Sequence, residues 1–158
     1  MGEPKAFTVL DLVDLDLKEQ NDLALTCIAG RAGLGRRITV PDINRPGLAL
    51  AGFYESFVWN RLQLFGRGEW AYLQKLEAEA SYEAVKTLFS YELPCCIFTA
   101  SLQPPASFLA AAEASGCPVL STSLSSSEFS GRILRVLTDI FAHKTTVHGV
   151  LVEVFGIG

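Results

Sequence analysis

The chain has 158 residues and a mass of 17.1 kDa, and 49% of its residues are apolar while 19% are charged. This length is sufficient for one domain with a sizeable core, and the composition excludes a disordered, collagen-like or low-complexity chain. The net charge of −4 argues against nucleic acid as a partner, because binding its phosphates requires an excess of Lys and Arg.

The sequence has neither a membrane span nor a secretion signal. A run of about 18 consecutive apolar residues, which a membrane helix requires, does not occur. The acidic residues within MGEPKAFTVLDLVDLD do not fit a signal peptide. We therefore expect a soluble, cytoplasmic protein with no membrane partner.

Residues 1–60 predict an irregular, turn-rich region. TVLDLVDLDL is expected to form a helix capped by Thr8, because Val9, Leu12 and Val13 share one helical face. The apolar run LALTCIAG is typical of a strand. The glycine- and proline-rich segment that follows predicts mostly loop, with short strands at RRITV and GLALAG.

From Arg61 onward the pattern alternates between strands and helices. The expected strands are RLQLFG, CCIFTA and CPVLST, and the expected helices are 68–90, PASFLAAAEAS and 126–141. Gly116 is suited to end the second helix, and Ser125 with Glu128 fits a capping box for the third. This alternation predicts an α/β fold with a mainly parallel sheet and crossover helices.

The last segment, TTVHGVLVEVFGIG, is apolar and β-branched enough for a central strand. It reaches Gly158 without a turn, a cap or a polar tail. We therefore expect the chain to be a fragment whose parent continues into another domain.

The four cysteines do not form a metal-binding pattern. Cys27, Cys95, Cys96 and Cys117 include no C-x-x-C pair and have no His at the spacing of zinc ligands. Three of them lie in the apolar runs PCCIFTA and GCPVL, where thiols usually behave as small buried hydrophobes. Adjacent cysteines on a strand have poor geometry for a disulfide, which fits a reducing compartment.

Common catalytic motifs are absent from the sequence. It contains no G-x-x-x-x-G-K-[ST], G-x-S-x-G or H-E-x-x-H, and GRAGLGRR has the wrong spacing for a dinucleotide-binding loop. His143 falls at the predicted end of the last helix, where a cation interacts favourably with the helix dipole. His148 begins the expected final strand, and the residue pattern by itself favours a structural role for it.

Arginine is concentrated in one segment. Residues 31–67 contain six arginines and two acids, a local charge of +4 that leaves −8 for the remainder of the chain. Within this segment, Arg45 lies in a loop stiffened by Pro41 and Pro46. A fixed guanidinium suits recognition of a carboxylate or phosphate ligand. The alternative, which has equal weight, is that Arg45 pairs with an internal carboxylate and staples the loop.

Several of these runs together resemble a known family. ITVPDINRPGLALAGFYESF and RLQLFG, then PCCIFTASLQPP and TVHGVLVEVFGIG, are similar in this order to the N-terminal half of the bacterial HPr kinase/phosphorylase family. The resemblance covers nearly the whole chain. It implies a three-layer α/β/α fold with a mixed, mainly parallel sheet, similar to the N-terminal domain of the muramyl ligases.

The resemblance also implies an activity for the parent protein. The family phosphorylates a serine of the phosphocarrier HPr with ATP or pyrophosphate, removes that phosphate by phosphorolysis, and acts in carbon catabolite regulation as a hexamer. Residues 1–142 would then form the N-terminal domain, and residues 143–158 a connecting strand to a C-terminal P-loop kinase domain. The alternative is a stand-alone module that binds an anion, a nucleotide or a protein without catalysis.

Site residues carry over at few positions. His148 matches an active-site histidine of the family's V-H-G-V run, which implies a catalytic role in proton handling or phosphate contact. The family's catalytic Lys, Mg²⁺-binding Ser and Asp base match no position up to Gly158, so the resemblance implies no cofactor in this chain and ATP with Mg²⁺ in the kinase domain. The chain alone is therefore expected to be inactive. The candidates for anion binding are Arg45, Arg36 and Arg37.

Overall fold

Five strands form one sheet in the computed structural model, which describes residues 6–20 and 22–150, with side chains up to His143. In the order β1-β5-β4-β3-β2, the sheet contains β1 (Leu25–Ala29), β5 (Val119–Thr122), β4 (Cys96–Phe98), β3 (Leu62–Phe65) and β2 (Ile43–Asn44). The pairs β2–β3, β3–β4 and β4–β5 are parallel, whereas β1 is antiparallel to β5. The prediction of a mixed, mainly parallel sheet is confirmed.

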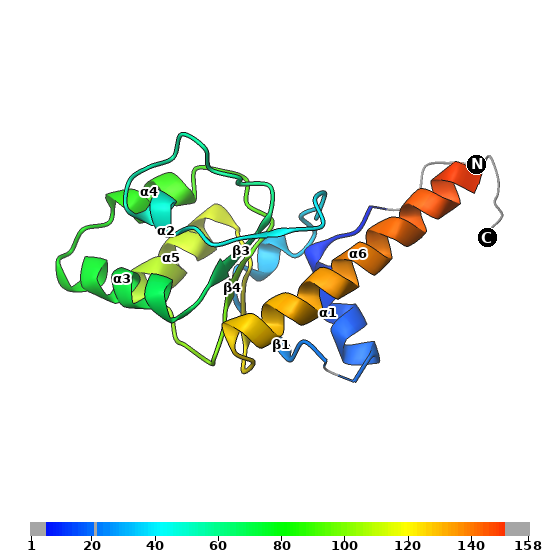
Figure 1. Cartoon of the computed structure of the whole chain (residues 1–158). Coiled ribbons are helices and arrows are strands. Elements are labelled where there is room, and N and C mark those ends of the chain that lie inside the picture. The colour runs from blue at the N-terminus through cyan, green and yellow to red at the C-terminus, as the bar shows by residue number, and fades with distance from the viewer. Residues whose placement is uncertain (1–5, 21, 151–158) are drawn as a thin grey trace.

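Helices cover both faces of this sheet (Figure 1). On one face lie α1 (Val9–Lys18) and α6 (Ser126–Val150), and on the other lie α3 (Arg67–Ala78), α4 (Glu83–Leu88) and α5 (Ala106–Ser115). The short helices α2 (Gly47–Leu50) and η1 (Arg31–Gly33) belong to the connections between β1 and β3. The three-layer α/β/α arrangement is therefore confirmed. None of the helices in the described part of the chain is long and apolar enough to cross a membrane.

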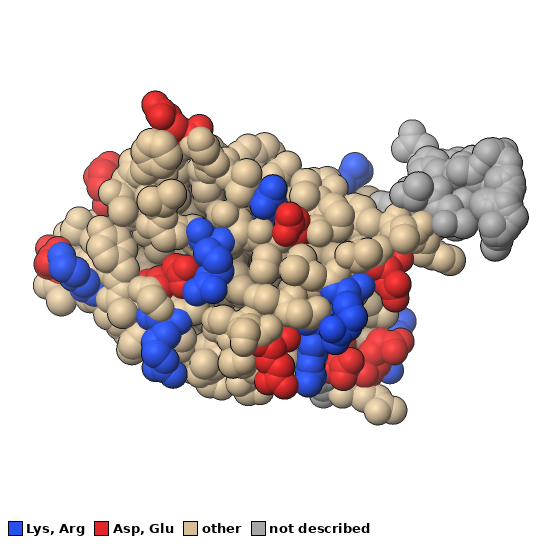
Figure 2. Space-filling model, viewed as in Figure 1, with Lys and Arg blue, Asp and Glu red and all other residues tan. Residues whose placement is uncertain are grey.

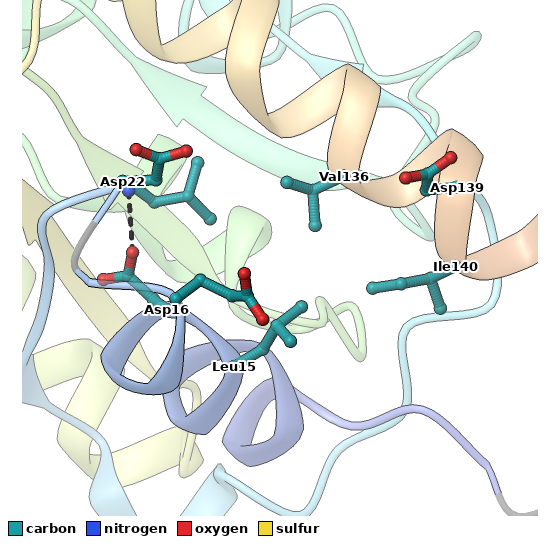
Figure 3. A pocket seen from close by; sticks show the side chains of 8 residues that line it. Leu15, Asp16, Asp22, Val136, Asp139 and Ile140 are labelled. Atoms are coloured by element: carbon teal, nitrogen blue, oxygen red, sulfur yellow. Dashed lines mark hydrogen bonds between the residues drawn. The ribbon is translucent and has the colours of Figure 1, made fainter.

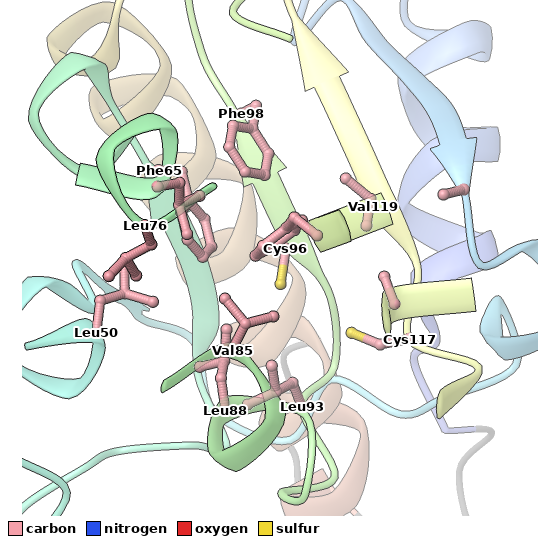
Figure 4. Close-up of a cluster of buried hydrophobic side chains, with 14 residues drawn as sticks. Leu50, Phe65, Leu76, Val85, Leu88, Leu93, Cys96, Phe98, Cys117 and Val119 are labelled. Atoms are coloured by element: carbon pink, nitrogen blue, oxygen red, sulfur yellow. The ribbon is translucent and has the colours of Figure 1, made fainter. Parts of the chain in front are cut away.

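The two layers of core follow from the alternation of side chains along the strands. Residues Leu62, Leu64 and Ile97 pack toward α1 and α6, while Phe65 and Phe98 pack toward α3, α4 and α5. In the second cluster, drawn in Figure 4, the Phe65 and Phe98 rings stack with centroids 4.5 Å apart. Buried aromatic pairs of this kind add to the stabilisation that burial provides.

The cysteines behave as the sequence predicts. Cys95, Cys96 and Cys117 are buried free thiols, and the neighbours Cys95 and Cys96 belong to opposite core clusters. Burial raises the pKa of the Cys95 and Cys96 thiols well above the ordinary value. Both residues therefore remain protonated near neutral pH and act as small apolar side chains.

The expected helix caps are present. The Thr8 Oγ1 accepts the Asp11 N–H at 3.1 Å, and Asp11 Oδ2 accepts the Thr8 N–H at 2.9 Å, which closes a capping box at the start of α1. Gly116 ends α5 with a left-handed φ of 72°. At α6, Ser125 Oγ accepts the Glu128 N–H at 3.2 Å, which is one of the two bonds of the expected capping box, while the Glu128 carboxylate pairs with Arg132 instead.

The helix expected over residues 68–90 is two helices, α3 and α4. Ala80 adopts a left-handed φ of 51°, and the Ser81 N–H donates to the Leu76 carbonyl at 2.9 Å, an arrangement that ends a helix. Both helices bury apolar residues in the same cluster, so their combined pattern reads as one continuous stripe.

Two short strands expected in the first third do not form. RRITV is loop, and its only bridge to a described residue joins Arg37 to Thr8. GLALAG contains helix α2, which starts after Pro46 and buries Ala49 and Leu50. Runs this short lack the length at which apolar periodicity separates strand from helix.

The last helix is longer than predicted. α6 continues through Val150 instead of ending near residue 141, so the connecting strand expected over 143–158 is wrong for residues 143–150. Propagating an existing helix satisfies one backbone hydrogen bond per added residue, whereas a strand requires a neighbouring strand. The helix crosses the expected boundary between residues 142 and 143, and residues 151–158 lie outside the described part of the chain.

Gly30→Ala is expected to destabilise the fold strongly. Gly30 has a φ of 69°, and a Cβ atom there would lie 1.9 Å from the Cys117 carbonyl oxygen. Backbone strain and overlap together predict a loss of about 3 kcal/mol or more in the free energy of unfolding. Urea unfolding followed by circular dichroism measures this loss.

Gly35→Ala is the matched control, because a Cβ atom there meets no atom within 4 Å. We expect it to change the free energy of unfolding by less than about 1 kcal/mol. Similar unfolding midpoints for the two variants would contradict the close approach of Gly30 to Cys117.

Candidate functional site

The carboxyl ends of the parallel strands form the edge at which open α/β sheets usually bind ligands. The loop between β2 and α2 brings Arg45 to this edge, next to the start of α3. The Arg45 Nε donates to Glu69 Oε2 at 3.0 Å and its Nη2 donates to Glu69 Oε1 at 2.8 Å. This is a two-pronged ion pair, so the internal carboxylate that the sequence left as an alternative is the observed partner of Arg45.

Glu69 joins three backbone segments. It stands at the third position of α3, its side chain is only 10% exposed, and its Oε1 also accepts the Gly66 N–H at 2.9 Å. Gly66 leaves room for the two side chains that approach it. A Cβ atom on Gly66 would lie 2.6 Å from both Arg45 Nη2 and Ser126 Oγ.

Thr99, directly after β4, and Ser126, at the start of α6, form a further contact at the same edge of the sheet. Their hydroxyl oxygens are 2.7 Å apart, and Thr99 Oγ1 also donates to the Phe65 carbonyl at 3.3 Å. The ends of β3 and β4 and the start of α6 are thereby tied together. The next residues, Ala100 and Ser101, both have left-handed φ values, 53° and 54°. Such backbone strain in non-glycine residues persists only where surrounding contacts hold it.

The electrostatics of the edge follow from the same contacts. Partial burial by itself would raise the pKa of Glu69, but hydrogen bonds from Arg45 and from backbone N–H groups outweigh it and lower the pKa. Glu69 is therefore ionised at neutral pH and compensates the Arg45 charge. A cavity of about 230 Å³ lies beside the pair, lined in part by Tyr72, Gly47 and Gly68. At this edge the loops are held by hydrogen bonds, and the Arg45 guanidinium is already paired with the Glu69 carboxylate.

Arg36 and Arg37 lie away from Arg45, at the opposite edge of the sheet. The Arg36 Nη1 donates to the Leu93 carbonyl at 2.6 Å, just before β4, and its Nη2 donates to the Ser115 carbonyl at 2.8 Å, just before β5. Arg37 is exposed. The structure therefore does not unite the three arginines into one site. On the face in Figure 2, Lys and Arg alternate with Asp and Glu, and no continuous basic surface forms.

A second cavity, between α1 and α6, was not indicated by any sequence motif (Figure 3). It holds about 310 Å³, and its lining includes Leu15, Asp16, Val136 and Ile140. Asp16 is only 2% exposed, and it accepts the backbone N–H groups of Leu23 at 2.7 Å and Leu25 at 2.9 Å. Asp16 thus fixes the turn between α1 and β1. Its position on the buried face of α1, four residues after Leu12, is the signal that sequence reasoning overlooked.

A family model described as "HPr Serine kinase N terminus" matches residues 13–137. The chain belongs to this family.

Two similar proteins carry the name HPr kinase/phosphorylase. The Treponema pallidum (strain Nichols) protein is 52% identical over 147 residues, which are 93% of this chain and 46% of that protein. The Leptospira biflexa protein is 40% identical over 146 residues, which are 92% of this chain and 45% of that protein. The chain therefore spans about half the length of the curated relatives it matches.

One solved structure is also similar to this HPr kinase N-terminal domain. It contains the CBS and DRTGG domains of the regulatory region of Clostridium perfringens pyrophosphatase. Its similarity to this chain has a TM-score of 0.47 and a sequence identity of 13%. The match covers 72% of this chain and 43% of that chain.

The two histidines differ in what the structure describes. His143 is exposed on α6, but the helix continues for two further turns, so His143 does not lie at the helix end as predicted. His148 belongs to the last turn of α6, and its side chain lies outside the described residues. The catalytic role that the family resemblance implies for His148 stays a prediction.

The Arg45–Glu69 ion pair is expected to stabilise this HPr kinase N-terminal domain. Replacing either residue by Gln removes one charge and the two-pronged geometry of the pair and leaves a partly buried, ionised partner, which should cost about 1–2 kcal/mol of unfolding free energy. A double-mutant cycle with Arg45→Gln and Glu69→Gln should give a coupling energy of about 1 kcal/mol.

The pair Lys75–Glu79 is a matched control, since it has the same 2.8 Å N···O distance but side chains that are 61% and 52% exposed. Its coupling energy should be clearly smaller than that of Arg45 and Glu69, because solvent screens an exposed pair. If the two coupling energies are equal, Arg45 does not brace the loop.

The stabilisation by Glu69 should also depend on pH. Because its pKa is lowered below the ordinary value of 4.5 in the folded chain, the carboxylate contributes full stability above that pH and loses it as the pH falls through the lowered pKa. The difference in unfolding free energy between the natural chain and Glu69→Gln should therefore be constant from neutral pH down to about 5 and shrink below it. Denaturant titrations at several pH values measure this difference, and one that persists unchanged at acidic pH would contradict the assignment.

Proposed function

We propose that this chain is the N-terminal, non-catalytic domain of a bifunctional HPr kinase/phosphorylase. The observation that carries the proposal is the 52% identity, over 93% of the chain, to the Treponema pallidum protein of that name. The complete enzyme would phosphorylate a serine of HPr with ATP or pyrophosphate and remove the phosphate with inorganic phosphate. HPr is thus the proposed substrate. We further propose that the enzyme is cytoplasmic and acts in carbon catabolite regulation.

The division of labour between the two domains is also part of this proposal. Phosphoryl transfer requires metal and cationic groups around the phosphates, and we assign these, with ATP and Mg²⁺, to a P-loop domain beyond this chain. The coverage of only 46% of the Treponema pallidum protein supports a second domain. The hexamer would form through that domain.

The present domain is proposed to contribute one residue, His148, to the site of the kinase domain, although it has no activity alone. α6 starts at the braced sheet edge, where Ser126 contacts Thr99, and extends beyond the sheet toward the end of the chain (Figure 1). His148, in the last turn of this helix, would reach the phosphate-binding loop of the kinase domain and handle a proton there or contact phosphate.

An activity assay with two proteins tests the proposal. The full-length product of the gene should phosphorylate HPr on serine in the presence of ATP and Mg²⁺, and should release that phosphate when inorganic phosphate is added. The 158-residue chain alone should do neither. HPr phosphorylation or ATP hydrolysis by the short chain would contradict the non-catalytic role, and an inactive full-length product would contradict the proposed activity.

His148→Ala in the full-length protein should lower the rate of phosphoryl transfer at least about tenfold, because removing an acid–base group typically costs that much or more. His143→Ala is the matched control, since His143 lies on the same helix and is exposed. Equal rates for both variants would argue for a structural role of His148. If the gene ends at codon 158, without a downstream G-x-x-x-x-G-K-[ST] motif, the stand-alone binding module is favoured instead.

A further inference from the structure

A pocket lies at the amino edge of the sheet, opposite the Arg45–Glu69 pair. It holds about 220 Å³, and its lining includes Arg36, Arg37, Trp59, Asn60, Glu92 and Pro94. Asn60 and Pro94 shortly precede β3 and β4, respectively, and Arg36 and Arg37 come from the loop after η1. Three separate segments therefore converge on this pocket.

Arg37 supplies a cation that no contact within the described part of the chain uses. It is exposed, and its side chain makes no hydrogen bond or ion pair with any residue in the described ranges. Its backbone is nevertheless fixed on both sides. The Ile38 N–H donates to the Phe7 carbonyl at 2.8 Å, and the Arg36 carbonyl accepts the Val9 N–H at 3.0 Å. The guanidinium thus extends from a rigid base.

Trp59 forms a second wall of the pocket, and hydrogen bonds also fix the turn that carries it. Gln63, which is completely buried, donates from its Nε2 to the carbonyls of Val58 at 3.0 Å and Arg61 at 2.9 Å. These bonds fix the turn that carries Trp59 and Asn60. Trp59 remains 43% exposed despite this support. Neither the indole N–H of Trp59 nor the Asn60 amide bonds to another described residue.

The charge of the pocket is positive. Arg36 donates to two carbonyls but keeps its charge, and Arg37 adds another. The Glu92 carboxylate lies 4.0 Å from Arg36 and is 80% exposed, so solvent screens most of its effect. Two guanidinium groups and one exposed carboxylate give the pocket a formal charge of +1.

We propose that this pocket binds a small anion that carries a flat ring. Arg37 would form the paired hydrogen bonds that a guanidinium makes with a carboxylate or phosphate. The ring would stack on the Trp59 indole, and the Asn60 amide would hydrogen-bond its polar edge. The pocket is smaller than the roughly 300–1,000 Å³ of sites for drug-sized ligands, so it would enclose the ring and the anionic group and leave the rest of a larger ligand in solvent. This inference does not depend on the proposed kinase activity.

Binding can be read from the two tryptophans of the chain by two-dimensional NMR of their indole N–H groups. Trp59 is the reporter. Trp70, whose Nε1 donates to the Gln103 carbonyl at 2.7 Å, is the internal reference. The probes are AMP and benzoate, which carry a ring with a phosphate or a carboxylate, and adenosine and inorganic phosphate, which each lack one of the two groups.

We expect AMP or benzoate to shift the Trp59 signal saturably while the Trp70 signal stays in place. Adenosine and inorganic phosphate should bind at least tenfold more weakly. A shift with AMP only identifies phosphate as the anion, and a shift with benzoate only identifies carboxylate. No saturable shift with either probe, or equal affinities for AMP and adenosine, would overturn the proposal.

Variants separate the two recognition groups. Arg37→Gln should weaken binding of the effective probe at least tenfold, and Arg37→Lys should recover part of the loss, because Lys keeps the charge but not the paired geometry. Trp59→Ala, followed through the backbone N–H of Asn60, should weaken it similarly. Arg67→Gln is the matched control, since Arg67 is also exposed but lies at the start of α3. Unchanged affinity in Arg37→Gln would overturn the proposal.

Discussion

The ion pair between Arg45 and Glu69 is the contact on which the carboxyl edge of the sheet depends. Two hydrogen bonds, of 3.0 and 2.8 Å, join the β2–α2 loop to the first turn of α3. The same carboxylate holds the Gly66 N–H, and Gly66 in turn allows Arg45 and Ser126 to approach. The edge that commonly binds ligands in such folds is thus occupied by the chain's own groups. Removing either charge leaves its partner partly buried and unpaired, so the loss of one residue destabilises the site of the other.

Much of the fold could be predicted because its signals are local. The capping box of Thr8 and Asp11, and the left-handed cap at Gly116, each depend on residues within one turn of a helix. The central strands are short apolar runs bounded by turn residues. The break between α3 and α4 had no such signal, since Ala80 takes a left-handed conformation that its residue type disfavours. Only the packing of both helices on one cluster shows why the chain turns there.

The candidate site was less predictable because its residues are far apart in the sequence. The loop sequence indicated Arg45 and left an internal carboxylate as one of two possible partners, but no local pattern pointed to Glu69, which is 24 residues away. The role of Gln63 was even less predictable from the sequence. This residue lies within an apolar strand, and only the structure reveals that its side chain donates to two carbonyls of the preceding turn. Buried polar residues of this kind acquire their partners from tertiary folding, so no short-range pattern announces them.

Charge that is concentrated along the sequence need not be concentrated in space. The segment 31–67 has a net charge of +4, yet the fold sends Arg45 to the carboxyl edge of the sheet and Arg36 to the amino edge. Each of these two side chains neutralises or satisfies groups of the chain itself. Arg36 bonds the ends of two segments that lead into β4 and β5, which are adjacent in the sheet, so it closes the amino edge as Arg45 closes the other. The residue next to it, Arg37, shares its rigid backbone but not its bonds. Among the described residues, Arg37 thus presents a cation without a partner on a fixed backbone, whereas Arg36 and Arg45 use their hydrogen bonds to hold the fold together.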